Sequence, residues 1–262
     1  DESTAAAEAM TMLYSLRNRE QKKNNVCNFF VSKNTLPQTI SLLETRAEPL
    51  GIQIQVGDFE QFQYDSNFYG CLMQYPGVFG DIKDIEKHCS NAKNNNIKIV
   101  VAADLFSLCL LKKPTQFGAD VVVGTSQRFG IPLGYGGPHA AYFATKDEYK
   151  RSVPGRIIGL TKDSDDDPAL RMALQTREQH IKRDRATSNI CTSQVLLAVM
   201  AGMYGVFHGP KGLKEIAASI HKKTAILERN LTKIGVKQHN KYFFDTLLLD
   251  GPTKKIKKIA EL

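Results

Sequence analysis

Short apolar runs alternate with segments of helical periodicity along the first half of the chain. Asp1, Ser3 and Thr4 suit a helix N-cap, and the residues up to Leu16 are strong helix formers. The pattern then predicts strands at 27–32, 52–56, 70–74, 98–102 and 121–124, and helices at 36–47 and 82–93. Such alternation is typical of a parallel sheet covered on both faces, so we expect an α/β fold with a mainly parallel sheet.

The pattern changes after Tyr142. The charged residues 162–168 predict a solvated turn, and 192–207 predict a buried helix. A long amphipathic helix over 211–234 should end at Gly235, before a strand at 243–249 and a helix starting near Thr253. We therefore expect a large domain over 1–207, a connecting helix over 208–236 and the start of a small C-terminal domain over 237–262. With no initial Met and an end inside a helical pattern, we expect a piece of a longer protein.

The composition narrows the class of protein. Of the 262 residues 42% are hydrophobic, enough for a core, yet no apolar stretch reaches the roughly 18 residues that cross a bilayer. The net charge of +8 is spread among acids, which argues against a nucleic-acid role and favours an acidic partner or an anionic ligand. The five cysteines have no CxxC spacing, so we expect no metal site, no disulfide framework and a reducing compartment.

Two places could hold an anionic cofactor. Ser3 and Thr4 lie in the first turn of the first helix, where N–H groups and hydroxyls can bind a phosphate; ordinary capping is the alternative, and the acidic Asp1 and Glu2 favour it. Asp104 directly follows an apolar strand, at the sheet edge where ligands bind in α/β folds. In a pyridoxal-phosphate enzyme it would pair with the pyridine nitrogen, and the alternative is an N-cap for a helix over 105–111.

The loop after the strand at 121–124 lacks a nucleophile. A pyridoxal-phosphate enzyme needs a lysine there for its Schiff base, and this chain has Gln127 and Arg128. Glutamine cannot form an imine, and arginine is always charged. We therefore predict no catalytic residue in this chain.

Two further stretches combine polar side chains with an unusual backbone. The first is a glycine-rich loop that permits close backbone approach, with a tight structural turn as the alternative; it contains Gly134, Tyr135, Gly136, Gly137 and His139. The second is a charged and amide-rich run that could bind a phosphate or carboxylate, with a solvated or subunit-facing loop as the alternative; it contains Thr187, Ser188 and Asn189.

Taken together, long strings of the sequence resemble the N-terminal half of the P-proteins, the glycine decarboxylases of the glycine cleavage system. The string QRFGIPLGYGGPH at 127–139 is the most distinctive, and the others lie at 1–10, 36–39, 118–120, 174–181 and 186–192. One departure is Ser3, where many relatives have glycine. The resemblance covers nearly the whole chain.

The resemblance implies a fold, an activity and partners. P-proteins consist of two related halves or two subunits, each with the type I pyridoxal-phosphate-enzyme fold, which is aspartate aminotransferase-like. Only the C-terminal half carries the lysine, so that half, and not the half that this chain resembles, would bind most of the pyridoxal phosphate. Glycine loses CO2, and its aminomethyl group passes to the lipoyl arm of the H-protein. The implied partners are the C-terminal half or second subunit and the lipoylated H-protein, in a dimeric assembly.

The resemblance also suggests where this chain acts. Our hypothesis is that the residues singled out in the glycine-rich loop, together with 187–189, face the partner half and shape its cofactor or lipoyl channel. A non-catalytic scaffold that docks the H-protein is one alternative, and an autonomous aminotransferase-like enzyme is another. We expect the isolated chain to be inactive, and its setting to be a bacterial cytoplasm or, alternatively, a mitochondrial matrix.

Overall fold

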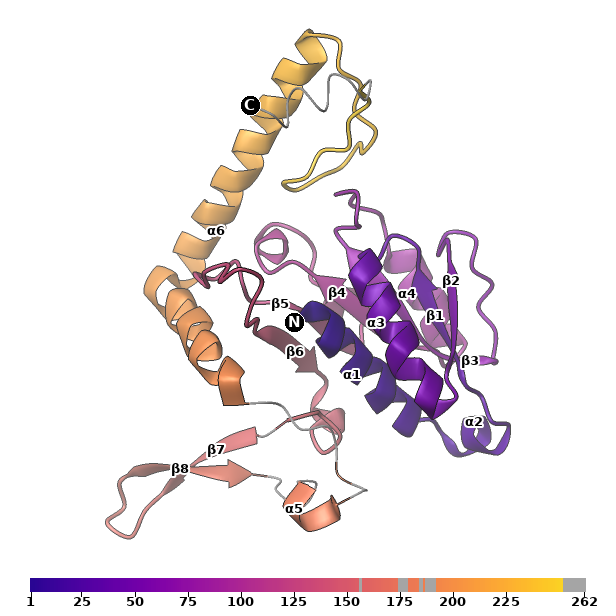
Figure 1. Cartoon of the computed structure of the whole chain (residues 1–262), viewed down its shortest axis with the longest axis vertical. Coiled ribbons are helices and arrows are strands. Elements are labelled where there is room, and N and C mark those ends of the chain that lie inside the picture. Colours follow the sequence, from indigo (N-terminus) through magenta and orange to yellow (C-terminus); the bar gives the residue numbers. More distant parts are fainter. Residues whose placement is uncertain (156, 174–178, 184–185, 187–191, 252–262) are drawn as a thin grey trace.

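The fold is described from a computed structural model (Figure 1), which describes residues 1–155, 157–173, 179–183, 186 and 192–251. The helices are α1 Glu2–Ser15, α2 Arg19–Lys23, α3 Pro37–Ala47, α4 Glu86–Asn94, α5 Gln179–Lys182 and α6 Val195–Lys233. The strands are β1 Asn28–Ser32, β2 Gln53–Gly57, β3 Phe68–Tyr75, β4 Lys98–Ala103, β5 Val121–Thr125, β6 Ala141–Thr145, β7 Ile157–Lys162 and β8 Pro168–Ala173.

Six strands form one sheet in the order β2-β1-β3-β4-β5-β6. The pairs from β2 to β5 are parallel, and β6 pairs antiparallel with β5, with Gly124 opposite Tyr142. The carboxyl ends of β3, β4 and β5 therefore meet at one edge. The predicted mainly parallel α/β fold is confirmed, and every strand predicted before residue 125 is present.

Alternation along the strands divides the core between the two faces of the sheet. On β4, Val100 and Ala102 point into the cluster under α1 and α3, whereas Ile99 and Val101 point into the cluster under α4. Figure 1 shows α1 and α3 on the near face and α4 on the far face. A strand buried on both sides has no polar face, and this explains its continuous apolar sequence.

The first helix is the most deeply buried one in contact with the sheet. Asp1 caps it, since its carboxylate accepts the Thr4 N–H at 2.7 Å. Ala6, Ala7 and Ala9 are fully buried, and small side chains let α1 lie close to the sheet. The expected helix at the start of the chain is confirmed.

The part after β6 differs from the expectations in several ways. Strands β7 and β8 form a separate hairpin that the sequence analysis missed, although the predicted turn at 162–168 joins them. The two predicted helices at 192–207 and 211–234 form one element, α6, which bends at Gly209, where φ is 61°, before Pro210. Figure 1 shows α6 running along one side of the molecule, with the hairpin drawn below its lower end.

Three sequence predictions were wrong in detail. The helix expected over 82–93 begins only at Glu86, and the helix expected over 105–111 is a single 3₁₀ turn at Ser107–Cys109. The stretch 243–249 makes only isolated bridges, Asp81 to Phe243 and Gln238 to Leu249, and does not extend the sheet. The helix expected near residue 253 lies outside the described residues.

The helix predicted as buried over 192–207 is present but mostly uncovered. Its large apolar side chains are exposed by more than half: Val195, Leu196, Val199, Met203, Val206 and Phe207. Leu197 and Ala201, on its inner side, contact Ile131 and Ala140. Apolar residues on both sides of a helix predict burial, and here nothing in the described part of the chain covers the outer side.

Candidate functional site

The loops that follow β4 and β5 bring Asp104 and Arg128 together at the carboxyl edge of the sheet. Arg128 Nη1 lies 3.0 Å from Asp104 Oδ2. The other carboxylate oxygen of Asp104 accepts the Ser107 N–H at 2.7 Å, so Asp104 also caps the 3₁₀ turn. Of the two interpretations of Asp104, the capping contact is present in the structure, and its second oxygen is paired with Arg128.

Arg128 has further partners that the sequence analysis missed. The same Nη1 atom lies 2.8 Å from Asp245 Oδ2, and the guanidinium lies 5.4 Å and 5.6 Å from the ring centroids of Phe106 and Phe244. Both rings are almost fully buried. The sequence signal for these contacts was weak, because Phe244 and Asp245 lie far along the chain, in a stretch whose apolar pattern predicted a strand.

The first turn of α1 lies near this edge and adds acids. Glu2 accepts a hydrogen bond from Gln74 Nε2 at 3.2 Å. Burial raises the pKa of Glu2, and Asp104 raises it further. Burial also raises the pKa of Asp104, against the opposing effect of Arg128. Burial therefore disfavours the charged forms of both carboxyl groups, and of these two only Asp104 has Arg128 as a partner.

These residues do not fit pyridoxal phosphate. Ser3 is buried and its hydroxyl is bonded to Thr39 at 2.9 Å, while the Asp1 carboxylate occupies the Thr4 N–H that a phosphate would need. Asp104, the expected partner of the pyridine nitrogen, is already paired with Arg128. Gln127 and Arg128 hold the position where the lysine was expected. The polar groups expected to bind the cofactor are therefore paired with other groups of this chain, and the loop after β5 has no lysine at 127 or 128.

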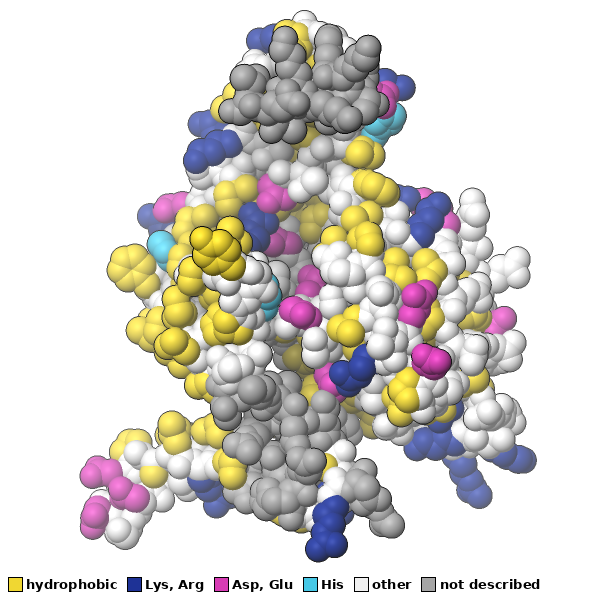
Figure 2. All heavy atoms as spheres, in the orientation of Figure 1, with side chains coloured by type: hydrophobic (Ala, Val, Ile, Leu, Met, Phe, Trp, Pro, Cys, Tyr) yellow, Lys and Arg dark blue, Asp and Glu magenta, His cyan; other side chains and the backbone are white. Residues whose placement is uncertain are grey.

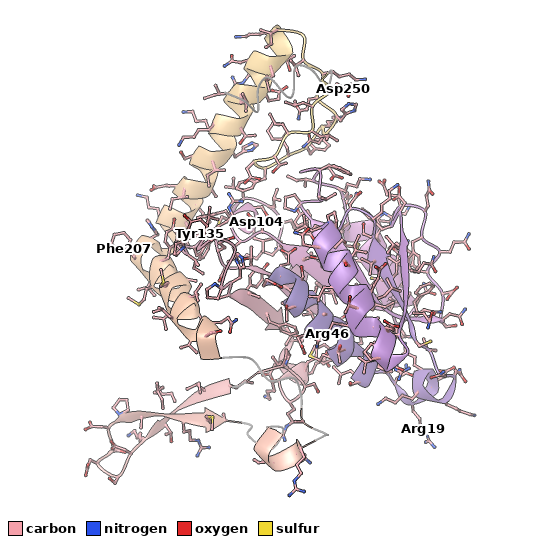
Figure 3. The ribbon with its side chains drawn as sticks, viewed as in Figure 1. Arg19, Arg46, Asp104, Tyr135, Phe207 and Asp250 are labelled. Atoms are coloured by element: carbon pink, nitrogen blue, oxygen red, sulfur yellow. The ribbon has the colours of Figure 1, made fainter. Side chains whose placement is uncertain are left out.

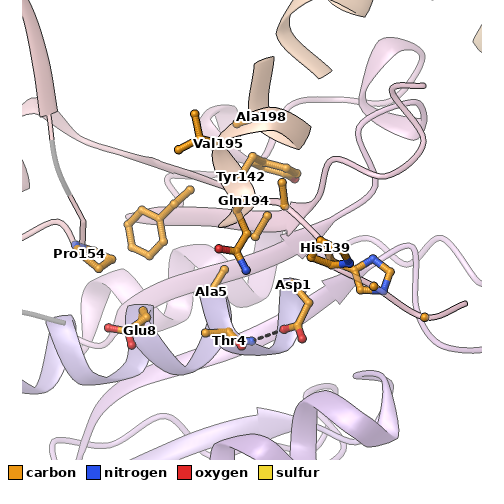
Figure 4. A pocket seen from close by; sticks show the side chains of 16 residues that line it. Asp1, Thr4, Ala5, Glu8, His139, Tyr142, Pro154, Gln194, Val195 and Ala198 are labelled. Carbon is orange, nitrogen blue, oxygen red and sulfur yellow. Dashed lines mark hydrogen bonds between the residues drawn. The ribbon is translucent and has the colours of Figure 1, made fainter. Parts of the chain in front are cut away.

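A second feature is a cavity of about 550 Å³ beside α1, β6 and the start of α6 (Figure 4). Its walls are largely apolar, and Asp1, Thr4, Glu8, His139 and Gln194 add polar groups. Glu8 is tied to α3 through Arg46 Nη2 at 2.6 Å. A volume of this size suits a small ligand or the side chains of a partner.

The glycine-rich loop borders this cavity. Gly136, Gly137 and half-buried His139 line it, whereas Tyr135 is fully exposed at φ 55°. A Cβ on Gly134, at φ 53°, would lie 2.6 Å from the Gly137 carbonyl oxygen, so this turn requires glycine there. A left-handed backbone is uncommon for a residue other than glycine, and the Tyr135 side chain lies in solvent.

The second predicted group, Thr187, Ser188 and Asn189, lies outside the described residues. Among the residues that the structure does describe, no group of three or more His, Cys, Asp or Glu side chains could hold a metal ion. The same part of the chain contains no helix with the length and apolar character to cross a membrane.

Solved structures define the class of this fold. The chain superposes on an aspartate aminotransferase from Thermus thermophilus with a TM-score of 0.59 at 14% identity, over 96% of this chain and 67% of that one. A cysteine desulfurase from Thermococcus onnurineus gives a TM-score of 0.60 at 15% identity, over 100% and 65%. The protein therefore has the aspartate aminotransferase-like fold of type I pyridoxal-phosphate enzymes.

Closer similarity identifies the family. An inhibitor-bound glycine decarboxylase (P-protein) of the glycine cleavage system matches with a TM-score of 0.87 at 30% identity, covering 100% of this chain and 60% of that one. Residues 1–261 match the family model "Glycine cleavage system P-protein", and the chain belongs to this family. The predicted family is confirmed.

The chain spans only part of the length of the relatives that it matches. It is 63% identical to the glycine dehydrogenase (decarboxylating) of Christiangramia forsetii and 59% identical to that of Flavobacterium johnsoniae, over 261 residues in each case. These matches cover 100% of this chain but 28% of each relative. The relatives are bacterial.

Proposed function

We propose that this chain is the lysine-lacking part of a glycine decarboxylase and that it completes an active site held by the rest of the parent enzyme. The observation that carries the proposal is the pairing of Arg128 with Asp104 and Asp245. The pairing supports the proposal because it ties up Arg128, which lies in the loop where we expected a Schiff-base lysine. The catalytic chemistry then belongs elsewhere in the parent, and the isolated chain is inactive.

The parent reaction is proposed from the family. Glycine is decarboxylated, and its aminomethyl group passes to the lipoyl group of an H-protein. Pyridoxal phosphate, bound mainly by the other half, supplies the electron-withdrawing ring that stabilises charge as CO2 leaves. The setting that we propose is a bacterial cytoplasm, as suggested by the bacterial relatives.

In this proposal the cavity beside α1 faces the partner half. His139 and the backbone of Gly136 and Gly137 supply polar groups at its rim, and Ala5, Phe143 and Val195 supply apolar walls. Figure 4 shows the His139 ring near Asp1, across the cavity from Pro154. Walls of this kind can orient an uncharged ligand such as a lipoyl arm while excluding water. The chain would thus shape the channel without taking part in bond formation.

The outer side of α6 is the proposed contact with the partner. Figure 2 shows apolar side chains gathered along the edge where Figure 1 draws the first half of α6, and Figure 3 places Phe207 and Tyr135 in the same region. Phe207 is 85% exposed. Continuous apolar patches of this kind mark protein interfaces. The domain division at 207 and 236 remains a proposal, supported by the bend of α6 at Gly209.

The test uses the full-length parent. His139→Ala, Asn189→Ala and Phe207→Asp are each assayed for glycine–CO2 exchange, with Ala218→Asp, an exposed position in the second half of α6, as the matched control. We expect exchange to fall for the first three variants only. Unchanged kinetics at both His139 and Asn189 would overturn the channel assignment.

The scaffold alternative gives a different result in the same experiment. If this half only docks the H-protein, the loop variants will weaken H-protein binding while exchange at saturating H-protein is unchanged. A change in the maximal rate supports the channel. The two outcomes separate the proposals in one titration.

A further inference from the structure

The side chain of Arg128 is surrounded by groups that suit a guanidinium. Asp104 and Asp245 each place an oxygen within 3.0 Å of Nη1. The rings of Phe106 and Phe244 lie within cation–π range of the same group. We call these four residues the guanidinium cage. Carboxylates at the edge and phenyl rings nearby provide charge, hydrogen bonding and apolar contact together.

The cage joins two separate parts of the chain. Asp104 and Phe106 follow β4, whereas Phe244 and Asp245 belong to the segment 236–250 after α6. Two hydrogen bonds between uncharged groups also attach that segment: Ile82 N–H donates to the Tyr242 carbonyl at 2.9 Å, and Asn240 Nδ2 donates to the Phe79 carbonyl at 3.1 Å. The buried Phe244 adds apolar packing against Phe106 and Ala217. Arg128 therefore supplies a charged link to the edge of the sheet.

The cage depends on the cation. With Arg128 removed, two carboxylates of a partly buried site would face each other without a counter-ion, which is costly. The phenyl rings of Phe106 and Phe244 would also lose their contact with the planar guanidinium. The cost falls on segment 236–250, because Asp104 keeps its hydrogen bond to Ser107 in β4's own loop.

We propose that the guanidinium cage is a binding site for a guanidinium group, that Arg128 is its built-in ligand, and that this bound side chain positions segment 236–250 against the sheet. The inference shares the Arg128 contacts with the proposed function but does not require it, since the test reads local protection of segment 236–250 and not activity. Emptied of Arg128, the cage should accept a small guanidinium compound. Urea, which is planar but neutral, should not replace it.

The test is hydrogen exchange on the full-length parent carrying Arg128→Ala. The readout is the exchange of the peptides that contain the amides of Ile82 and Leu248, which bond to Tyr242 and to the Asn240 side chain. We expect exchange at both to rise by about tenfold or more, with peptides of β3 and β4 unchanged. Millimolar ethylguanidinium should restore protection, and urea at the same concentration should not.

Two variants guard against a trivial loss of structure. Asp245→Asn keeps Arg128 and Asp104 and should raise exchange in the same two peptides. Arg46→Ala removes a comparable arginine–carboxylate pair, to Glu8, and should leave these peptides unchanged. Unchanged exchange in both Arg128→Ala and Asp245→Asn, or equal recovery with urea and ethylguanidinium, would overturn the proposal.

Discussion

The phenol of Tyr142 reaches across β5 and donates a hydrogen bond to the Ala103 carbonyl oxygen at 2.7 Å. It can do so because Gly124, its partner in the β5–β6 register, has no side chain. A Cβ on Gly124 would lie 2.5 Å from the Tyr142 ring and closer still to the Ala103 carbonyl oxygen. The antiparallel β6 is thereby fastened to β4 directly beside Asp104.

Gly124→Ala should therefore destabilise the chain. The added methyl group meets backbone, which cannot move aside as a flexible side chain can, and overpacking of this kind costs about 1–3 kcal/mol. Gly202→Ala is the matched control, because a Cβ at Gly202 in α6 would meet nothing within 4 Å. That control should gain up to about 1 kcal/mol in helix propensity. Thermal unfolding followed by circular dichroism measures both; equal midpoints would contradict the packing argument.

Glu2→Gln should stabilise the chain at pH 7. Burial raises the pKa of Glu2, so the folded state disfavours its charged form, and the neutral amide avoids that cost. As the pH falls through the raised pKa, wild-type Glu2 takes up its proton and the difference should disappear. Unfolding midpoints of both proteins across the acidic range would show this convergence.

Asp58→Asn provides the opposite sign as a control. The hydrogen bond from Lys33 lowers the pKa of Asp58, so its contribution to stability is present above the ordinary pKa and is lost as the pH falls. Asp58→Asn should lose stability at pH 7 and match the wild type in acid. A gain at pH 7 from Asp58→Asn, or none from Glu2→Gln, would contradict the assignment of the two shifts.

Asn240→Ala should loosen segment 236–250. The buried amide donates to the carbonyls of Phe79 and Thr246 and accepts the Leu248 N–H. Leaving these groups unpaired should cost about 1–3 kcal/mol. Trypsin should then cut faster after Lys241. Asn94→Ala, on the exposed surface of α4, should not change the rate, and equal rates for the two variants would show that the amide does not hold the segment.

The isolated chain should form no specific internal imine with pyridoxal phosphate. Gln127 and Arg128 offer no nucleophile, and Asp104 is occupied. After incubation with equimolar cofactor, we expect no aldimine absorption band, and after subsequent reduction with borohydride we expect no single dominant labelled peptide. The full-length parent should trap the cofactor on one peptide outside this chain. A labelled peptide from residues 121–150 would favour the autonomous enzyme instead.

Sequence pattern alone was enough for the five parallel strands of the sheet, but it missed the antiparallel β6 and was insufficient for the site. Runs such as 98–103 are apolar on both sides because the strand is covered on both faces, so their place in the fold could be predicted. Asp104 and Arg128 could each be singled out because they follow such strands. The link of Arg128 to Asp245 could not be predicted, because Asp245 reaches the sheet edge only where the chain returns after the end of α6.

The interpretation of α6 failed for a different physical reason. Apolar periodicity indicates that a helix face is removed from water, but it does not indicate which chain covers that face. Val199 and Met203 have the composition of a core and are more than half exposed here. The same ambiguity concealed hairpin β7–β8, whose paired Leu160 and Leu170 are both exposed.

The uncovered side of α6 also determines how the chain will behave in preparation. Six large apolar side chains on one helix form an exposed apolar patch, and such patches drive non-specific self-association in water. Made without the remainder of its parent, the chain should aggregate as its concentration rises, and sulfate should make this worse. Co-expression with that remainder, or a mild detergent, should keep it monodisperse.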